Sequence, residues 1–291
     1  MLNLLGSLLT EIAKLILKPV VKHNLSVMFA ELNSQIGGIT GSVAKTPDIW
    51  NADVFAFIRQ LSENVMMPIA GMIISAVLSY ELITVAIDKN NMHDFDTGLF
   101  FRFLFKSCIA VLLLSKTFDM TMAFFDVGRY LVDKATASIT GISAVDYGSQ
   151  LKAAFEAQYD TFDFGELLEF TLETTAVTMA MRILSIIISV VLYGRMIEIY
   201  MYISIAPIPF ATLTNREWGQ MGTNYLRAIA ALALQGFFIV ICVGIYAVLV
   251  RSLSVSSDVS KSMRAVFCFT VVLCFSLMKT GSFAKSITGA H

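Results

Sequence analysis

The sequence is poor in charged residues, which make up 15% of its 291 positions, compared with about 25% in soluble globular proteins. Hydrophobic residues account for 56%, and the mean hydropathy is +0.73. This apolar excess is more than a soluble core can enclose, so the composition predicts a membrane protein. The net charge of −1 gives no support to nucleic-acid binding through an overall positive charge.

Residues that form metal, disulfide and catalytic sites are also scarce. The four cysteines lie inside apolar runs and form no C-x-x-C pair, and the three histidines are far apart in the chain. The sequence contains no P-loop, H-E-x-x-H or G-x-S-x-G motif. It therefore predicts no metal site, no cofactor and no enzymatic activity, so any ATP-driven step belongs to another polypeptide.

Long apolar runs are abundant, and a bilayer core of about 30 Å requires about 20 of their residues in a helix. Three runs are long and nearly uncharged, and three more are shorter, carry charges near one end or contain proline. The sequence predicts an all-α polytopic membrane helical bundle with five or six transmembrane helices plus interfacial amphipathic helices. In chain order the six runs are 65–87, 99–115, 174–193, 196–213, 226–250 and 265–278.

The segments between these runs complete the predicted organisation. Residues 1–36 have helical apolar spacing with a separate charged face, which predicts an interfacial amphipathic helix. Residues 37–64 are expected to form a linker, 65–115 the first two spans, and 174–279 the remaining spans, with 280–291 as a tail. The acidic segment 116–173 contains a second amphipathic helix and is expected outside the cell.

Orientation depends on the lysine and arginine distribution. The basic residues at 194–195 and 251–264 are the candidates for the cytoplasmic side, which with six spans leaves the acidic segment outside. If 196–213 is re-entrant instead, the last two spans reverse. The sequence leaves both arrangements open.

The run 174–193 carries polar residues at helical spacing. They recur at i, +3, +7, +10 and +14, which places them on one face, and we call them the polar stripe: Thr175, Thr178, Arg182, Ser185 and Ser189. An arginine facing lipid at mid-depth costs about 2.5–3.5 kcal/mol. The stripe is therefore expected either to form interhelical hydrogen bonds or to line a water-filled pore. Glu81 and Glu198 are the candidate ion-pair partners of Arg182.

Two further sets of small residues predict close helix packing, because small side chains let membrane helices approach one another. Their members recur every three or four residues along one helix face. The first set is Gly71, Ser75 and Ser79, and the second is Ala228, Ala231 and Gln235.

Proline and aromatic residues mark the end of the fourth run. Pro207 and Pro209 lack the N–H that a helix needs, so they are expected to break the helix. Trp218 and Tyr225 follow the break and are expected to anchor the chain at the membrane interface.

Residues 206–236 carry a recognisable pattern. It consists of Ala206-Pro207-Ile208-Pro209 at the end of an apolar run, a short loop with Asn215-Arg216-Glu217-Trp218-Gly219, and a long apolar run with Leu234-Gln235-Gly236. This pattern resembles the TrbL-like conjugal transfer family, in the form found in Gram-positive conjugative elements.

The resemblance implies a multi-pass channel or platform subunit of a type IV secretion system in the cytoplasmic (inner) membrane. Such a subunit forms a homo-oligomer, assembles with other membrane subunits and cytoplasmic ATPases, and takes part in the transfer of relaxase-bound DNA. The alternative is a secondary transporter or small-ion channel that uses the break at Pro207 and Pro209 beside the polar stripe. The absence of an inverted repeat argues against this alternative.

Overall fold

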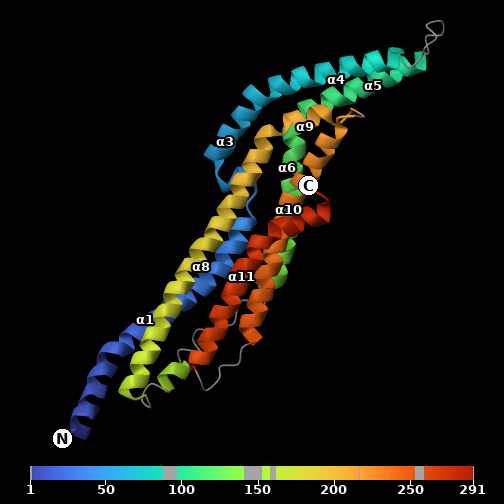
Figure 1. Cartoon of the computed structure of the whole chain (residues 1–291). Helices are drawn as coiled ribbons and strands as arrows, with labels where there is room; N and C mark the ends of the chain where they lie inside the picture. Colours follow the sequence, from blue (N-terminus) through green and yellow to red (C-terminus); the bar gives the residue numbers. More distant parts are fainter. Residues whose placement is uncertain are drawn as a thin grey trace. The chain divides into compact units, whose positions relative to one another are not determined.

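The computed structural model describes residues 2–87, 97–140, 153–157, 162–215, 217–252 and 259–290. These residues form helices joined by short turns, without strands (Figure 1), so the predicted all-α class is confirmed. The helices are α1 (Leu2–Val43), α2 (Pro47–Trp50), α3 (Ala52–Leu61), the π-helical turn η1 (Ser62–Met66), α4 (Met67–Ile87), α5 (Thr97–Ser115), α6 (Thr117–Thr140), α8 (Phe164–Ile205), α9 (Pro207–Thr212), α10 (Gly219–Ser252) and α11 (Val259–Thr288).

Four helical stretches in the described residues are long and apolar enough to cross a membrane. They are Ala52–Thr84, Phe164–Ile205, Gly219–Ser252 and Val259–Thr288. α5 and α6 form a pair bent by 64° that counts as a fifth span if the two act together. By length and hydropathy the described residues thus contain four candidate spans, or five if the bent pair counts as one, where the sequence predicted five or six.

The difference in span count arises in α8. The predicted runs 174–193 and 196–213 are not separate spans, because α8 continues without interruption to Ile205. No proline occurs in α8, and Gly194 alone does not stop a helix whose neighbours are good helix formers. The charges near 195 therefore lie inside a helix and not in a loop.

The predicted linker at 37–64 is also wrong, because most of it is helical. α1 continues through Gly37 and Gly38 to Val43, and α2 and α3 follow. Asn51 caps α3, its Oδ1 accepting hydrogen bonds from the backbone N–H groups of Asp53 (3.1 Å) and Val54 (3.0 Å). Small polar residues suggested flexibility, but the cap and the helix propensity of the flanking residues determine the local structure.

The chain divides into two compact units, each described here by itself. Unit 1 comprises Met1–Val43, Val132–Tyr193 and Phe238–Thr280, and unit 2 comprises Ala44–Leu131, Gly194–Phe237 and Gly281–His291. In unit 1, α1 lies beside the first half of α8 (Figure 1). Its fully buried side chains include Leu25, Met28, Leu167 and Met181.

Unit 2 contains two apolar clusters. The larger one joins α8, α9 and α10 around Ile203, Phe210 and Ile229. The smaller one packs α9 against α4 and α5, with Ala70, Ala110 and Ala211 at its centre. Figure 1 shows α4 and α5 running side by side above α9.

Candidate functional site: polar groups within the helices

The middle of α8 is an uncharged segment with a single exception. Between Glu173 and Arg195 the only charged residue is Arg182. At a rise of 1.5 Å per residue, residues 174–194 extend over about 30 Å, which matches the hydrocarbon core of a bilayer. Arg182 lies near the centre of this segment, so its surroundings decide what the polar stripe does.

The first turns of the polar stripe contact α1. Asn24 donates from Nδ2 to Thr175 Oγ1 (2.9 Å) and to Thr174 Oγ1 (3.4 Å), while Thr178 Oγ1 donates to the Asn24 carbonyl oxygen (3.3 Å). Asn24, Thr174 and Thr178 are all buried. This part of the stripe forms interhelical hydrogen bonds. Sequence analysis missed Asn24, although it occupies the apolar face of α1, where an isolated amide requires a partner.

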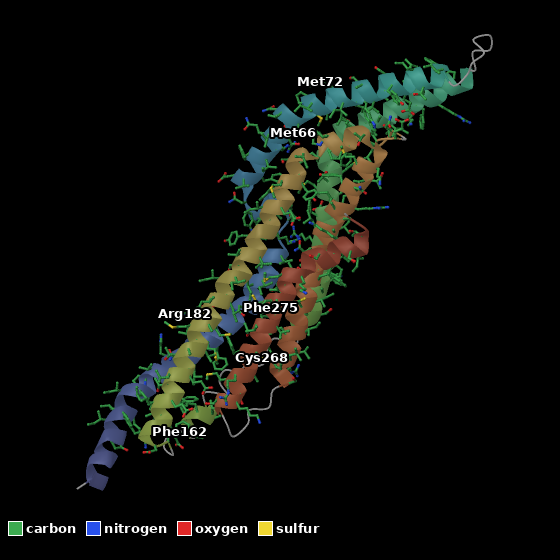
Figure 2. All side chains as sticks on the ribbon, in the orientation of Figure 1. Met66, Met72, Phe162, Arg182, Cys268 and Phe275 are labelled. Atoms are coloured by element: carbon green, nitrogen blue, oxygen red, sulfur yellow. The ribbon has the colours of Figure 1, made fainter. Side chains whose placement is uncertain are left out.

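The later part of the polar stripe is more open. Arg182 and Ser189 are exposed and Ser185 is half-buried, and Figure 2 labels Arg182 on α8. Ser189 Oγ donates to the carbonyl oxygen of Ser185 in its own helix (3.0 Å). Within the part of the chain that the structure describes, Arg182 makes no ion pair.

Both candidate partners of Arg182 are paired with lysines in unit 2. Glu81 of α4 forms an ion pair with Lys106 of α5, and Glu198 of α8 pairs with Lys285 of α11 (2.9 Å). The structure therefore assigns these carboxylates to lysines and gives no support to either as the partner of Arg182. In each case a lysine on a neighbouring helix lies closer to the glutamate, and a single sequence does not reveal which helices are neighbours.

Arg195, a candidate for the cytoplasmic side between two predicted spans, does not lie between separate helices. It lies within α8 and is buried, with 8% of its surface exposed. Its Nη2 donates to the carbonyl oxygen of Leu232 in α10 (3.2 Å). Nε has no hydrogen-bond partner among the described residues. Buried charges are usually paired, so Arg195 is an unusual cross-helix contact with a neutral acceptor.

The two sets of small residues differ in their surroundings. Ala228, Ala231 and Gln235 of α10 are buried, and α11 approaches Gln235 closely at Gly281, where a Cβ atom would lie 3.2 Å from Gln235 Nε2. On α4, Ser75 and Ser79 are exposed and Gly71 is half-buried with open space around it. α4 packs instead through Ala70 and Ile74.

The helix break lies where the prolines place it. α8 ends at Ile205 and α9 begins at Pro207. The Ile203 carbonyl oxygen, which Pro207 cannot serve, accepts a hydrogen bond from the Ala206 N–H (3.3 Å). Ala206, Pro207 and Pro209 are buried. The break therefore turns the chain so that α9 docks on α4 and α5.

The two predicted anchors have different environments. Trp218 is 51% exposed and stacks on Tyr80, with ring centroids 6.4 Å apart, and Tyr80 donates from Oη to Glu217 (3.2 Å). Tyr225 is buried, and its hydroxyl donates to the Tyr202 carbonyl oxygen (2.9 Å). The anchor prediction is wrong for Tyr225, because α10 packs this side chain against Tyr202 of α8 and Phe210 of α9.

Ion pairs gather at one end of unit 1. Lys22 of α1 contacts Glu156 (2.5 Å), and Arg264 at the start of α11 contacts Glu173 of α8 (3.3 Å). Lys22 holds the pKa of the Glu156 carboxyl below its ordinary value, first through the hydrogen bond and then through charge attraction. Glu173 and the first turns of α11 therefore lie on the same side, as expected only if 196–213 is not a complete span.

The comparisons with known proteins address the family. In the described residues no three His, Cys, Asp or Glu side chains form a group that could hold a metal ion. No curated protein matches the sequence. A family model described as TrbL/VirB6 plasmid conjugal transfer like protein matches residues 32–207, about three fifths of the chain. Most of the pattern at 206–236 lies beyond this match, so two largely separate segments indicate one family. The chain belongs to the TrbL/VirB6 plasmid conjugal transfer-like family.

Proposed function

We propose that this protein is a membrane subunit of a conjugative type IV secretion system and acts as a homo-oligomer in the cytoplasmic membrane. In this role it assembles with other membrane subunits and with cytoplasmic ATPases, and it takes part in the transfer of relaxase-bound DNA. Membership of a conjugal transfer family and the four apolar helices long enough to cross a membrane support this function.

The observation that carries the homo-oligomer is the open small-residue face of α4. Gly71, Ser75 and Ser79 form a continuous strip that no helix of the described chain covers. Membrane helices associate through such strips. Lipid is as apolar as the helix surface, so the hydrophobic effect does not bring helices together, and close packing between them drives the contact instead. A second copy of α4 is the simplest partner for this face.

Transport of DNA would require positive charge near the path. Arg102 and Arg227 are exposed, and a ring of subunits would repeat each of them around a common axis. The positive charge that these repeated arginines would place around the axis supports a direct role in DNA transfer over a purely scaffolding role.

The transporter alternative depends on an open broken helix, and no observation favours it. Ala206 is fully buried and Pro207 and Pro209 are buried beside it, within apolar packing. Broken helices that bind substrates line cavities, whereas this one joins α9 to its neighbours.

The function is tested by complementing a deletion of the gene. We expect the wild-type gene to restore DNA transfer and Ser75→Leu to reduce transfer at least tenfold while shifting the native mass in mild detergent to smaller assemblies. Ser75→Ala keeps the residue small and Met72→Leu alters an adjacent exposed position, so both should behave like the wild type. If Ser75→Leu forms the same assemblies and transfers DNA normally, the α4 interface is wrong.

Assembly of the partner subunits in the deletion strain distinguishes a part in the transfer step from a scaffolding role. If the partner subunits assemble normally without this protein, it takes part in the transfer step. If they fail to assemble, the protein is a scaffold, and the proposed part in DNA passage is wrong.

A further inference from the structure

The contact between α1 and α8 fixes how these two helices are aligned. Both helices run in the same direction within unit 1 (Figure 1), and Asn24 of α1 meets Thr175 of α8. Because the helices are parallel, equal numbers of residues beyond this contact bring each helix to about the same height. The polar residues that follow on each helix can therefore be compared level by level.

The next polar level contains opposite charges. Glu31 lies seven residues after Asn24, and Arg182 lies seven residues after Thr175. Seven residues raise both positions by about 10 Å and turn them by only about 20° from the original direction. Both residues therefore project from the helix faces that meet at Asn24.

A third level continues the pattern. Gln35 follows Glu31 by four residues, and Ser185 follows Arg182 by three. Gln35 is 4% exposed, and neither atom of its side-chain amide has a hydrogen-bond partner in the described residues. A buried amide without partners is unfavourable, so this side of α1 requires polar neighbours at the height of Ser185.

The charges at the middle level also lack partners. Glu31 is half-buried and Arg182 exposed, and neither forms an ion pair within the described ranges. Glu81 and Glu198 are both occupied by lysines. Among the described residues of unit 1, Glu31 is thus an acid without an ion pair at the height of Arg182.

We propose that Glu31 is the counter-ion of Arg182 in the membrane, closing a polar seam between α1 and α8 within one chain. Packed helices lie about 8–10 Å apart, a gap that an arginine and a glutamate side chain bridge together by rotation of their side-chain torsions. The pair removes the exposed charge from the middle of α8, where contact with lipid is unfavourable. It places residues 24–43 of α1 alongside a membrane span.

Charge reversal tests the pair. We expect Glu31→Arg and Arg182→Glu each to lower the amount of protein in the membrane at least threefold and to lower the thermal midpoint in detergent. The double variant should recover most of both losses. Glu81→Arg combined with Arg182→Glu is the matched control and should show no recovery. A double variant of Glu31 and Arg182 that stays as damaged as the singles would overturn the proposal.

Disulfide trapping tests the geometry independently of stability. In a chain whose four native cysteines are replaced by serine, Glu31→Cys with Arg182→Cys should cross-link within one chain on mild oxidation. Glu31→Cys with Ile187→Cys is the control, because Ile187 projects from a different side of α8, and it should remain reduced. Cross-links found only between two differently tagged copies would show that the pair does not form within one chain, and absence of any cross-link would contradict the register.

Discussion

At the scale of single residues, burial of polar groups depends on contacts with residues that are distant in the sequence. Arg195 follows Tyr193 and Gly194, a combination typical of an interfacial loop, yet it is buried because α10 presents the Leu232 carbonyl oxygen. Tyr225 similarly looks like an interfacial anchor and is instead buried beside Tyr202. Residue type predicted that these side chains need polar contacts, but the contacts themselves come from distant parts of the chain.

Gly128 lies where the backbone of another helix approaches closely. A Cβ atom at this position of α6 would lie 2.8 Å from the backbone oxygen of Ala233 in α10. We expect Gly128→Ala to destabilise the protein by about 1–3 kcal/mol, because backbone cannot move aside as a flexible side chain can. Thermal unfolding in detergent measures the effect.

Gly194→Ala is the matched control for this prediction. It is also a glycine in a helix, but a Cβ atom there would meet nothing within 4 Å. The change should leave stability unaltered or raise it by up to about 1 kcal/mol through helix propensity. Equal stability of Gly128→Ala and the wild type would show that α6 and α10 do not approach so closely.

At the scale of elements, hydropathy located the spans well and their ends poorly. The runs 174–193, 226–250 and 265–278 fall inside helices that can cross a membrane, and the run 65–87 does so up to residue 84, because the bilayer demands uninterrupted apolar helix. Helix ends are set by caps and prolines, so α8 ends at Ile205, before Pro207, and α3 begins at Ala52, after its cap Asn51. The polar partner of the stripe was not predictable, since α1 is distant in sequence and is not itself among the apolar runs.

The helical segment 153–157 is tied to α1 by the ion pair between Glu156 and Lys22. The pKa of Glu156 lies below its ordinary value of 4.5, so the pair stabilises the folded state above about pH 4.5 and this contribution is lost as the pH falls through the lowered pKa. We expect an NMR titration of the labelled carboxyl to show the lowered pKa. Lys22→Met should return the pKa toward 4.5, whereas Lys22→Arg should keep it low; no change in Lys22→Met would contradict the assignment.

At the scale of the whole molecule, the continuity of α8 determines the topology. The sequence allowed the acidic segment and the basic segment 251–264 to lie on opposite sides, with 196–213 as an extra span. Between Glu173 and Arg264 the described residues provide two crossings, α8 and α10, so these two residues lie on one side, as their ion pair requires. The membrane side of each segment therefore cannot be predicted from its own lysine and arginine content, because acidic and basic residues meet at the same surface.

Cysteine accessibility in intact cells tests this topology. In a chain without native cysteines, Glu166→Cys and Arg251→Cys should react with a membrane-impermeant maleimide from the same side, and Gln220→Cys, between α9 and the apolar part of α10, should react only from the other. All three positions are exposed, so a failure to label reflects the bilayer and not burial. Labelling of positions 166 and 251 from opposite sides would require another crossing between them, which the unbroken helix from Phe164 to Ile205 leaves no room to form.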